Sequence, residues 1–126
     1  MNSNLVASVL KREKELLEEM LELASCEPEL VESGRAEDLE ILLSLRTDPL
    51  SELAAAERTI DAEMSEMGDP IASAEDLQQI NDLNLAIMEL ADRILAADQR
   101  TEWLAENSVD WMSAGMSATI RPGFSQ

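Results

Sequence analysis

Apolar residues in the second half of the chain recur at steps of three and four positions. This spacing is typical of the seam of a helix that packs lengthwise on other helices. The seam consists of Ile80, Leu83, Ile87, Leu90, Ile94, Ala97 and Leu104. It predicts a helix from about residue 73 to about residue 106, with a length of about 50 Å at 1.5 Å per residue. Ile87, Leu90 and Ile94 lie mid-helix on the seam, and we expect them to be buried.

A first helix is predicted from Ser3 or Asn4 to about residue 33. Either of these polar residues can cap free amide groups, and Gly34 accepts the left-handed conformation that closes a helix. The apolar stripe of this helix is predicted to be Leu5, Val9, Leu16, Met20 and Leu23. Pro28 removes one helical hydrogen bond, so a kink and a break at that point both remain open.

A further helical segment is predicted from about residue 36 to Met67. Its apolar stripe is Leu39, Leu43, Leu50, Leu53, Ile60, Met64 and Met67. Asp48 suits a helix cap and Pro49 a first helical turn, which predicts a kink or short break near residue 48. Ser73 and Asp76 then resemble a capping box at the start of the next helix.

Two charged residues, Arg46 and Glu57, occupy positions of this second apolar stripe. In one interpretation both long side chains reach sideways into water. In the other they set the register against charges on a neighbouring helix, because an unpaired charge in a seam is costly.

These segments predict an all-α fold, an antiparallel bundle of three long helices with coiled-coil-like packing over residues 1–107. Residues 108–126 form a separate tail, flexible or short-helical, in which Ser, Gly and Pro are frequent. The large apolar residues of the tail are Trp111, Met112, Met116, Ile120 and Phe124. They must either dock on the bundle or contact another chain, so we regard all five as candidate partner-binding residues.

Asn81 and Asn84 are polar positions within an otherwise apolar stretch of the third helix. They either form hydrogen bonds across helices and set register, or contact a bound partner. We therefore add both to the candidate partner-binding residues.

The chain is strongly acidic, with nine Lys and Arg against 27 Asp and Glu and a net charge of −18. Such a surface repels phosphate backbones, which disfavours nucleic acid and anionic membranes as partners. No apolar run approaches the roughly 20 residues of a membrane span, so we expect no membrane insertion. The lone Cys26 cannot form an internal disulfide, and no signal peptide is evident, which together indicate a cytoplasmic protein.

Reaction chemistry has little support in these residues. The chain has no His, the commonest general base and metal ligand, and no phosphate-binding loop or nucleophile motif. The cluster of Glu15, Glu18, Glu19 and Glu22 is typical of a solvated helix face. We expect no enzyme activity, no cofactor and no metal site.

Two stretches resemble the FlgN type of flagellar export chaperone. In residues 16–58 a Leu- and Glu-rich helix is followed by "ELVESGRAEDLEILLSLRTDPLSELAAAE", similar to the family in its polar turn, acidic pair and basic residue before a Leu-rich run. The second stretch is "LQQINDLNLAIMEL", where Asn81 and Asn84 match an Asn-rich part of the family. Arg46 stands where Lys is usual, and Pro49 interrupts a segment that continues in the family. The FliT type of flagellar chaperone is an alternative match.

The resemblance implies a non-enzymatic cytoplasmic chaperone. Its partners would be the C-terminal helical part of a hook-filament junction protein and the flagellar type III export apparatus. Two other classes stay open: a structural coiled-coil subunit or adaptor, including a homodimer, and an acidic mimic of nucleic acid that inhibits a DNA-binding protein.

Overall fold

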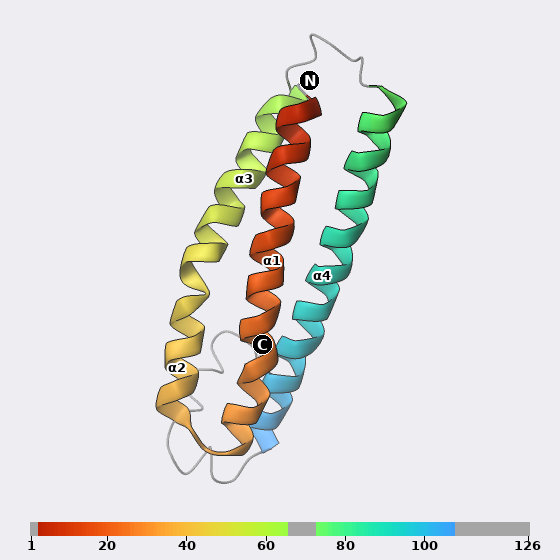
Figure 1. Cartoon of the computed structure of the whole chain (residues 1–126). Helices are drawn as coiled ribbons and strands as arrows, with labels where there is room; N and C mark the ends of the chain where they lie inside the picture. The colour runs from red at the N-terminus through yellow and green to blue at the C-terminus, as the bar shows by residue number, and fades with distance from the viewer. Residues whose placement is uncertain (1–2, 66–72, 108–126) are drawn as a thin grey trace. The chain divides into compact units, whose positions relative to one another are not determined.

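The computed structural model describes residues 3–65 and 73–107, and within these ranges it contains helices and no strand. The helices are α1 (Ser3–Glu32), α2 (Ala36–Leu45), α3 (Thr47–Ser65) and α4 (Ala74–Asn107), as Figure 1 shows. The predicted all-α fold is confirmed. The segment predicted over residues 36–67 consists of two successive helices, α2 and α3.

The described residues form two compact units. Unit 1 contains α1 up to Glu19, α3 from Asp48 onward and α4 up to Ala91. Unit 2 contains α1 from Met20 onward, α2 with Arg46 and Thr47, and α4 from Asp92 onward. Each unit therefore combines three helical segments. The α4 segment of unit 2 is distant in sequence from the consecutive α1 and α2 segments that it packs with.

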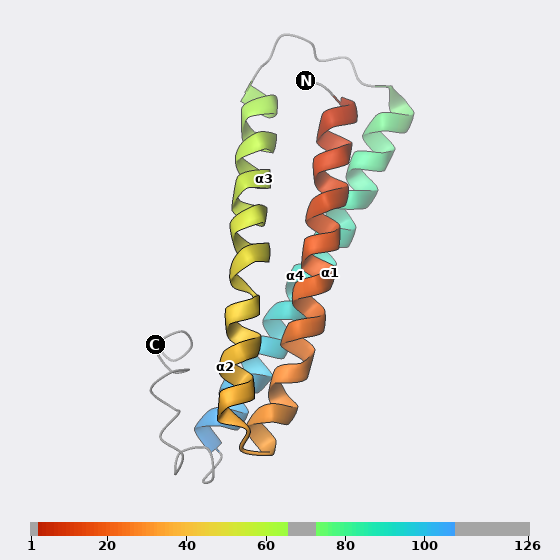
Figure 2. The same ribbon diagram turned by 60° about the vertical axis from the view of Figure 1, so that its left-hand side comes forward.

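In unit 1, α1 and α4 run in the same direction and α3 runs antiparallel to both (Figures 1 and 2). The hydroxyl of Ser3 donates a hydrogen bond to Asp76 Oδ2 at 3.1 Å, which joins the first turns of α1 and α4. On the surface, Arg12 of α1 pairs with Glu52 of α3. The buried apolar residues of unit 1 are Val6, Ala7, Leu10, Leu16 and Leu90.

Unit 2 has its own apolar cluster, to which all three of its helical segments contribute. Its buried members are Leu30, Val31, Leu39 and Ala105, and the partly buried Ala36, Leu42, Leu43 and Leu104 pack against them. Helices α1 and α2 meet here through a tight turn, which Figure 2 shows below the α2 label, at the lower end of both helices. Burial of this aliphatic surface is the main force that holds the unit together.

The turn between α1 and α2 depends on Gly34, as the sequence predicts. Gly34 has φ +69°, the left-handed conformation in which glycine is favoured. The Arg35 amide donates to the Leu30 carbonyl at 2.9 Å and the Gly34 amide donates to the Val31 carbonyl at 3.1 Å. These two bonds define a Schellman motif, which satisfies carbonyl groups that the end of the helix leaves free.

The two prolines of the helices behave differently. Pro28 is buried inside α1 and does not end it, so the alternative of a break is wrong. The break predicted near residue 48 is confirmed. It lies at Arg46, the C-cap residue of α2. Asp48 and Pro49 fall in the first turn of α3. Backbone amides in this turn have no acceptor within the helix, so the amide hydrogen that proline lacks costs no helical hydrogen bond. Asp48 is thus not the cap residue that we predicted.

The predicted seam of α4 is confirmed. Leu90 and Ile94 are buried, and Ile87 is partly buried, so the expectation for Ile87 was too strong. The helix also begins as predicted, because the Asp76 amide donates to the hydroxyl oxygen of Ser73 at 3.0 Å.

The predicted stripes of the other helices need correction at three positions. Leu5, Leu50 and Met64 are exposed, with 38%, 51% and 55% of their surface accessible. In α1 the buried positions near the start are Val6 and Leu10, each one residue after the predicted Leu5 and Val9. Met67 lies outside the described residues. A one-residue offset rotates a helix face by about 100°, and the wide apolar pattern of α1 permits either choice.

Candidate functional site

Helix α4 carries exposed apolar side chains in unit 1, on a side different from its buried seam. Leu77, Leu85 and Met88 have 49%, 64% and 62% of their surface accessible. At 100° of rotation per residue these three lie within an arc of about 80° of the helix surface. We call Leu77, Leu85 and Met88 the outer face of α4. A helix that is apolar on two sides has one side without a partner in its own unit.

The same helix exposes two large apolar residues in unit 2, Leu95 and Trp103. The sequence analysis did not identify this second apolar pattern. Its residues are interspersed with those of the predicted seam, which accounts for most of the apolar positions of the helix. The signal was present in the spacing, since Met88 and Leu95 are seven residues apart and Leu85 and Trp103 are 18 apart, both close to whole numbers of helical turns.

The two predicted asparagines are both exposed on α4. Asn81 lies one helical turn from both Leu77 and Leu85, so it belongs to the outer face. Asn84 lines a small pocket together with Leu10 and Glu57. No hydrogen bond links either amide to another helix within the described ranges, which does not support the register-setting interpretation. Their role in partner binding stays a prediction.

The five tail residues predicted to bind a partner all lie outside the described residues. They are Trp111, Met112, Met116, Ile120 and Phe124. Their part in partner binding is neither supported nor contradicted.

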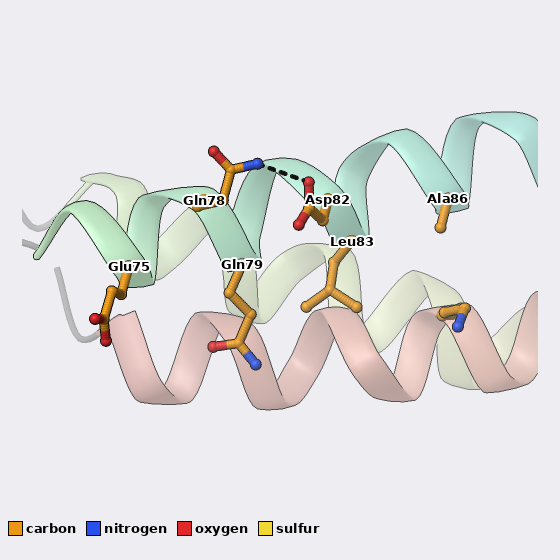
Figure 3. Close-up of a pocket in the computed structure, with 7 residues that line it drawn as sticks. Glu75, Gln78, Gln79, Asp82, Leu83 and Ala86 are labelled. Carbon is orange, nitrogen blue, oxygen red and sulfur yellow. Dashed lines mark hydrogen bonds between the residues drawn. The ribbon is translucent and has the colours of Figure 1, made fainter.

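A larger groove of about 490 Å³ runs between α1 and α4 in unit 1 (Figure 3). Gln79 and Leu83 point from α4 toward α1, and Lys14 of α1 completes the lining. Gln78 donates a hydrogen bond to Asp82 at 2.8 Å along the helix. The lining is mixed in polarity, with Leu83 and Ala86 beside Lys14 and Asp82.

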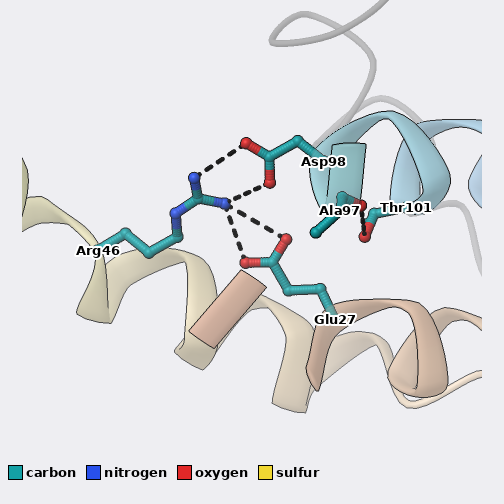
Figure 4. A network of polar contacts seen from close by, with 5 residues as sticks. All are labelled: Glu27, Arg46, Ala97, Asp98 and Thr101. Atoms are coloured by element: carbon teal, nitrogen blue, oxygen red, sulfur yellow. Dashed lines mark hydrogen bonds and ion pairs between the residues drawn. The ribbon is translucent and has the colours of Figure 1, made fainter. Parts of the chain in front are cut away.

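Unit 2 contains a charged cluster of three side chains, each from a different helical segment (Figure 4). Arg46 at the end of α2 donates to Asp98 of α4 through two nitrogens, at 2.8 and 3.0 Å. Its Nη1 also donates to Glu27 Oε2 of α1 at 3.2 Å. Glu27 is completely buried, while the side chains of Arg46 and Asp98 are 12% and 23% exposed.

The environment of Glu27 favours its neutral form. Burial raises the pKa of Glu27 to about 7, and the neighbouring Asp98 carboxylate adds to the rise while Arg46 opposes it. Desolvation therefore outweighs the attraction of a single, shared guanidinium. Buried Thr101 next to this cluster satisfies its hydroxyl by donating to the Ala97 carbonyl at 3.1 Å. The cluster joins three helices, and we assign it a structural role.

The acidic cluster that the sequence places on α1 forms a solvated surface. Glu15, Glu18, Glu19 and Glu22 are all exposed, as predicted. Within the described ranges no three or more His, Cys, Asp or Glu side chains are arranged to hold a metal ion. Cys26 is exposed and unpaired. No helix among the described residues combines the length and apolar character that crossing a bilayer requires.

Comparison with known proteins does not extend this description. No family model, curated protein or solved structure matches the chain.

Proposed function

We propose that this chain is a cytoplasmic chaperone of flagellar type III export that holds the helical end of a hook-filament junction protein. The observation that carries the proposal is the outer face of α4, because it is an exposed apolar surface on a regular helix. Such a face suits a second amphipathic helix, which would bury Leu77, Leu85 and Met88 against its own apolar side.

Two other properties support the proposal. The net charge of −18 keeps a complex with an apolar client in solution through mutual repulsion. Met88 is flexible and polarisable, and such side chains adapt to client helices of different shape. The resemblance to the FlgN type, carried by residues 16–58 and the Asn81–Asn84 region, supplies the class of client.

The test is a binding titration between the full chain and the C-terminal helical segment of a hook-filament junction protein from the same genome. We expect affinity to change little between low and high salt, because the contact is apolar and not ionic. Leu85→Lys and Met88→Lys should each weaken binding by about tenfold or more, since each places an unpaired charge in the apolar contact.

Leu50→Lys is the matched control, because Leu50 is a similarly exposed leucine on α3 of the same unit. It should bind the client as the unaltered chain does. Equal affinity of all three variants would contradict a binding site on α4.

The two other classes give different results in the same titration. A structural coiled-coil subunit would form a stable homo-oligomer, detected by light scattering at all concentrations, that Leu85→Lys dissociates. An acidic mimic of nucleic acid would bind a basic protein with an affinity that falls steeply with salt.

A further inference from the structure

A small pocket in unit 1 is lined by a buried carboxyl group. One oxygen of this group has no hydrogen-bond partner among the described residues. The pocket has a volume of about 210 Å³ and is lined by residues of α1, α3 and α4. The lining consists of Leu10, Glu13, Glu57, Ile60, Asp61 and Asn84. Its lining contains none of Leu77, Leu85 and Met88, and no residue of the charged cluster of unit 2.

Glu13 is the central group of this pocket. Only 6% of the residue is accessible, and its Oε1 atom has no hydrogen-bond partner in the part of the chain that the structure describes. A buried acceptor without a partner is destabilising and rare in folded proteins, so its presence needs an explanation. A bound donor would provide one.

The charges around Glu13 indicate which kind of donor fits. The titratable side chains that share the pocket are Glu57 and Asp61 of α3, and the lining residue from α4 is the neutral Asn84. Burial and the charge of Glu57 both raise the pKa of Glu13. Of the two basic residues that flank Glu13 in sequence, Arg12 is paired with Glu52 and Glu15, and Lys14 lines the groove between α1 and α4. A positive group in the pocket would therefore relieve the repulsion between the Glu13 and Glu57 carboxylates.

The apolar walls of the pocket indicate which class of cation fits, an organic or an inorganic one. Leu10 and Ile60 offer contact to an alkyl chain, and the carboxylates with the Asn84 side-chain oxygen offer acceptors to an N–H donor. Inorganic cations prefer several oxygen ligands in a fixed arrangement, and no such group of acids is present among the described residues. A volume several times that of one water molecule, about 30 Å³, leaves space for an organic group.

We propose that this pocket binds an alkylammonium group, with the Glu13 carboxylate as its main acceptor, Glu57 as a supporting charge and Leu10 and Ile60 against its alkyl chain. The inference does not depend on the identity of the client in the proposed function. The group has two natural sources, a free amine and a lysine side chain presented by a polypeptide, and both share this chemistry.

The experiment follows the methyl signals of Leu10 and Ile60 by NMR in the full chain, at constant ionic strength, during titration with n-butylammonium. We expect saturable shift changes, and a fall in the pKa of Glu13, since a bound cation favours the carboxylate. 1-Butanol, the neutral analogue, should produce neither change.

Glu13→Gln removes the charge and keeps the shape, and it should weaken n-butylammonium binding by about tenfold or more. Glu57→Gln, at an exposed position that tolerates substitution, should weaken it less. Glu18→Gln is the matched control, because Glu18 is an exposed acid of α1 in the same unit, and binding should stay within about twofold.

One further titrant separates the sources of the ammonium group. Equal or tighter binding of Nα-acetyl-lysine-N-methylamide would identify a lysine side chain as a ligand, and binding of n-butylammonium alone would identify a free amine. The proposal is overturned if neither amine gives saturable changes, if Glu13→Gln binds as well as the unaltered chain, or if Mg²⁺ produces the same shifts and displaces the amine.

Discussion

At the scale of single residues, Arg46 decides between the two interpretations of charged positions in an apolar stripe. Its guanidinium lies between Glu27 and Asp98, which belong to other helical segments of unit 2. The structure thus supports the register interpretation for Arg46. Glu57, the other charged stripe position, is exposed and agrees with the interpretation that it reaches into water. The two positions have different explanations because, among the residues that the structure describes, Arg46 pairs with opposite charges and Glu57 does not.

Arg46→Met should destabilise the protein by about 3 to 5 kcal/mol at pH 8, since it leaves Glu27 buried without its counter-charge. The loss should be smaller at pH 5, where Glu27 takes up a proton. Urea unfolding at both pH values measures the difference. Arg100→Met is the control, because Arg100 forms only an exposed pair with Glu32 at 3.5 Å. It should change stability by less than about 1 kcal/mol, and a similar loss in both variants would argue against the cluster.

Glu27→Gln should stabilise the protein at pH 8, by an amount on the order of 1 to 3 kcal/mol. The folded-state pKa of Glu27, about 7, exceeds the usual carboxyl value of 4.5. Below about pH 4.5 Glu27 is neutral in both the folded and the unfolded chain, so it does not affect the free energy of unfolding. As the pH rises from about 4.5 through about 7, ionisation favours the unfolded chain and the free energy of unfolding falls. The variant lacks this loss.

The check is the free energy of unfolding of Glu27→Gln and the unaltered chain from pH 4 to pH 8. Glu29→Gln, an exposed position on the same helix, should keep the pH dependence of the unaltered chain. Parallel curves for Glu27→Gln and the unaltered chain would show that Glu27 is ionised without penalty.

At the scale of helices, Gly34 ends α1 by a local requirement of the backbone. A Cβ atom at this position would meet nothing within 4 Å, so a substitution is opposed only by the left-handed conformation. Gly34→Ala should lower stability by about 1 to 2 kcal/mol, measured by urea unfolding. Gly34→Asn, which tolerates this conformation better, should lose less. Equal losses in both variants would indicate that the space around Gly34, and not its φ angle, matters.

The two sides of α4 should respond differently to truncation. Leu90→Ala removes a buried side chain and should cost about 2 to 5 kcal/mol, seen as a lower thermal midpoint. Met88→Ala, two residues away and exposed, should leave the midpoint nearly unchanged. If Met88→Ala destabilised as much as Leu90→Ala, the outer face would be part of a packed surface.

At the scale of the whole molecule, the tail from Val109 to Gln126 supplies the last prediction. If its apolar residues capture the client, deletion of residues 109–126 should leave the helical content of the remaining chain intact and abolish client binding. Circular dichroism and the binding titration measure these two properties. Undiminished binding would exclude the tail as the capture element, and loss of helical content would show that the tail belongs to the core.

Features that depend on neighbouring residues could be predicted from the amino-acid sequence. Helical periodicity placed the seam of α4, the Gly34 turn ended α1, the Ser73 cap began α4 and Pro49 marked the start of α3. Each of these follows from backbone geometry and hydrogen bonds within a few residues. The acidic, solvated character of the Glu15 to Glu22 helix face is likewise a local property.

The contacts between residues of different helices could not be predicted in this way and are known only from the folded chain. Arg46 and Asp98 are 52 positions apart, and no local pattern indicates that they pair. The burial of Glu13 and Glu27 was equally hidden, because a glutamate on a helix surface is normally solvated. The offset from Leu5 to Val6 and the exposure of Leu85 and Met88 depend on how each helix is rotated against its neighbours. That rotation is set by the packing of side chains from distant segments, which the order of residues along one helix does not specify.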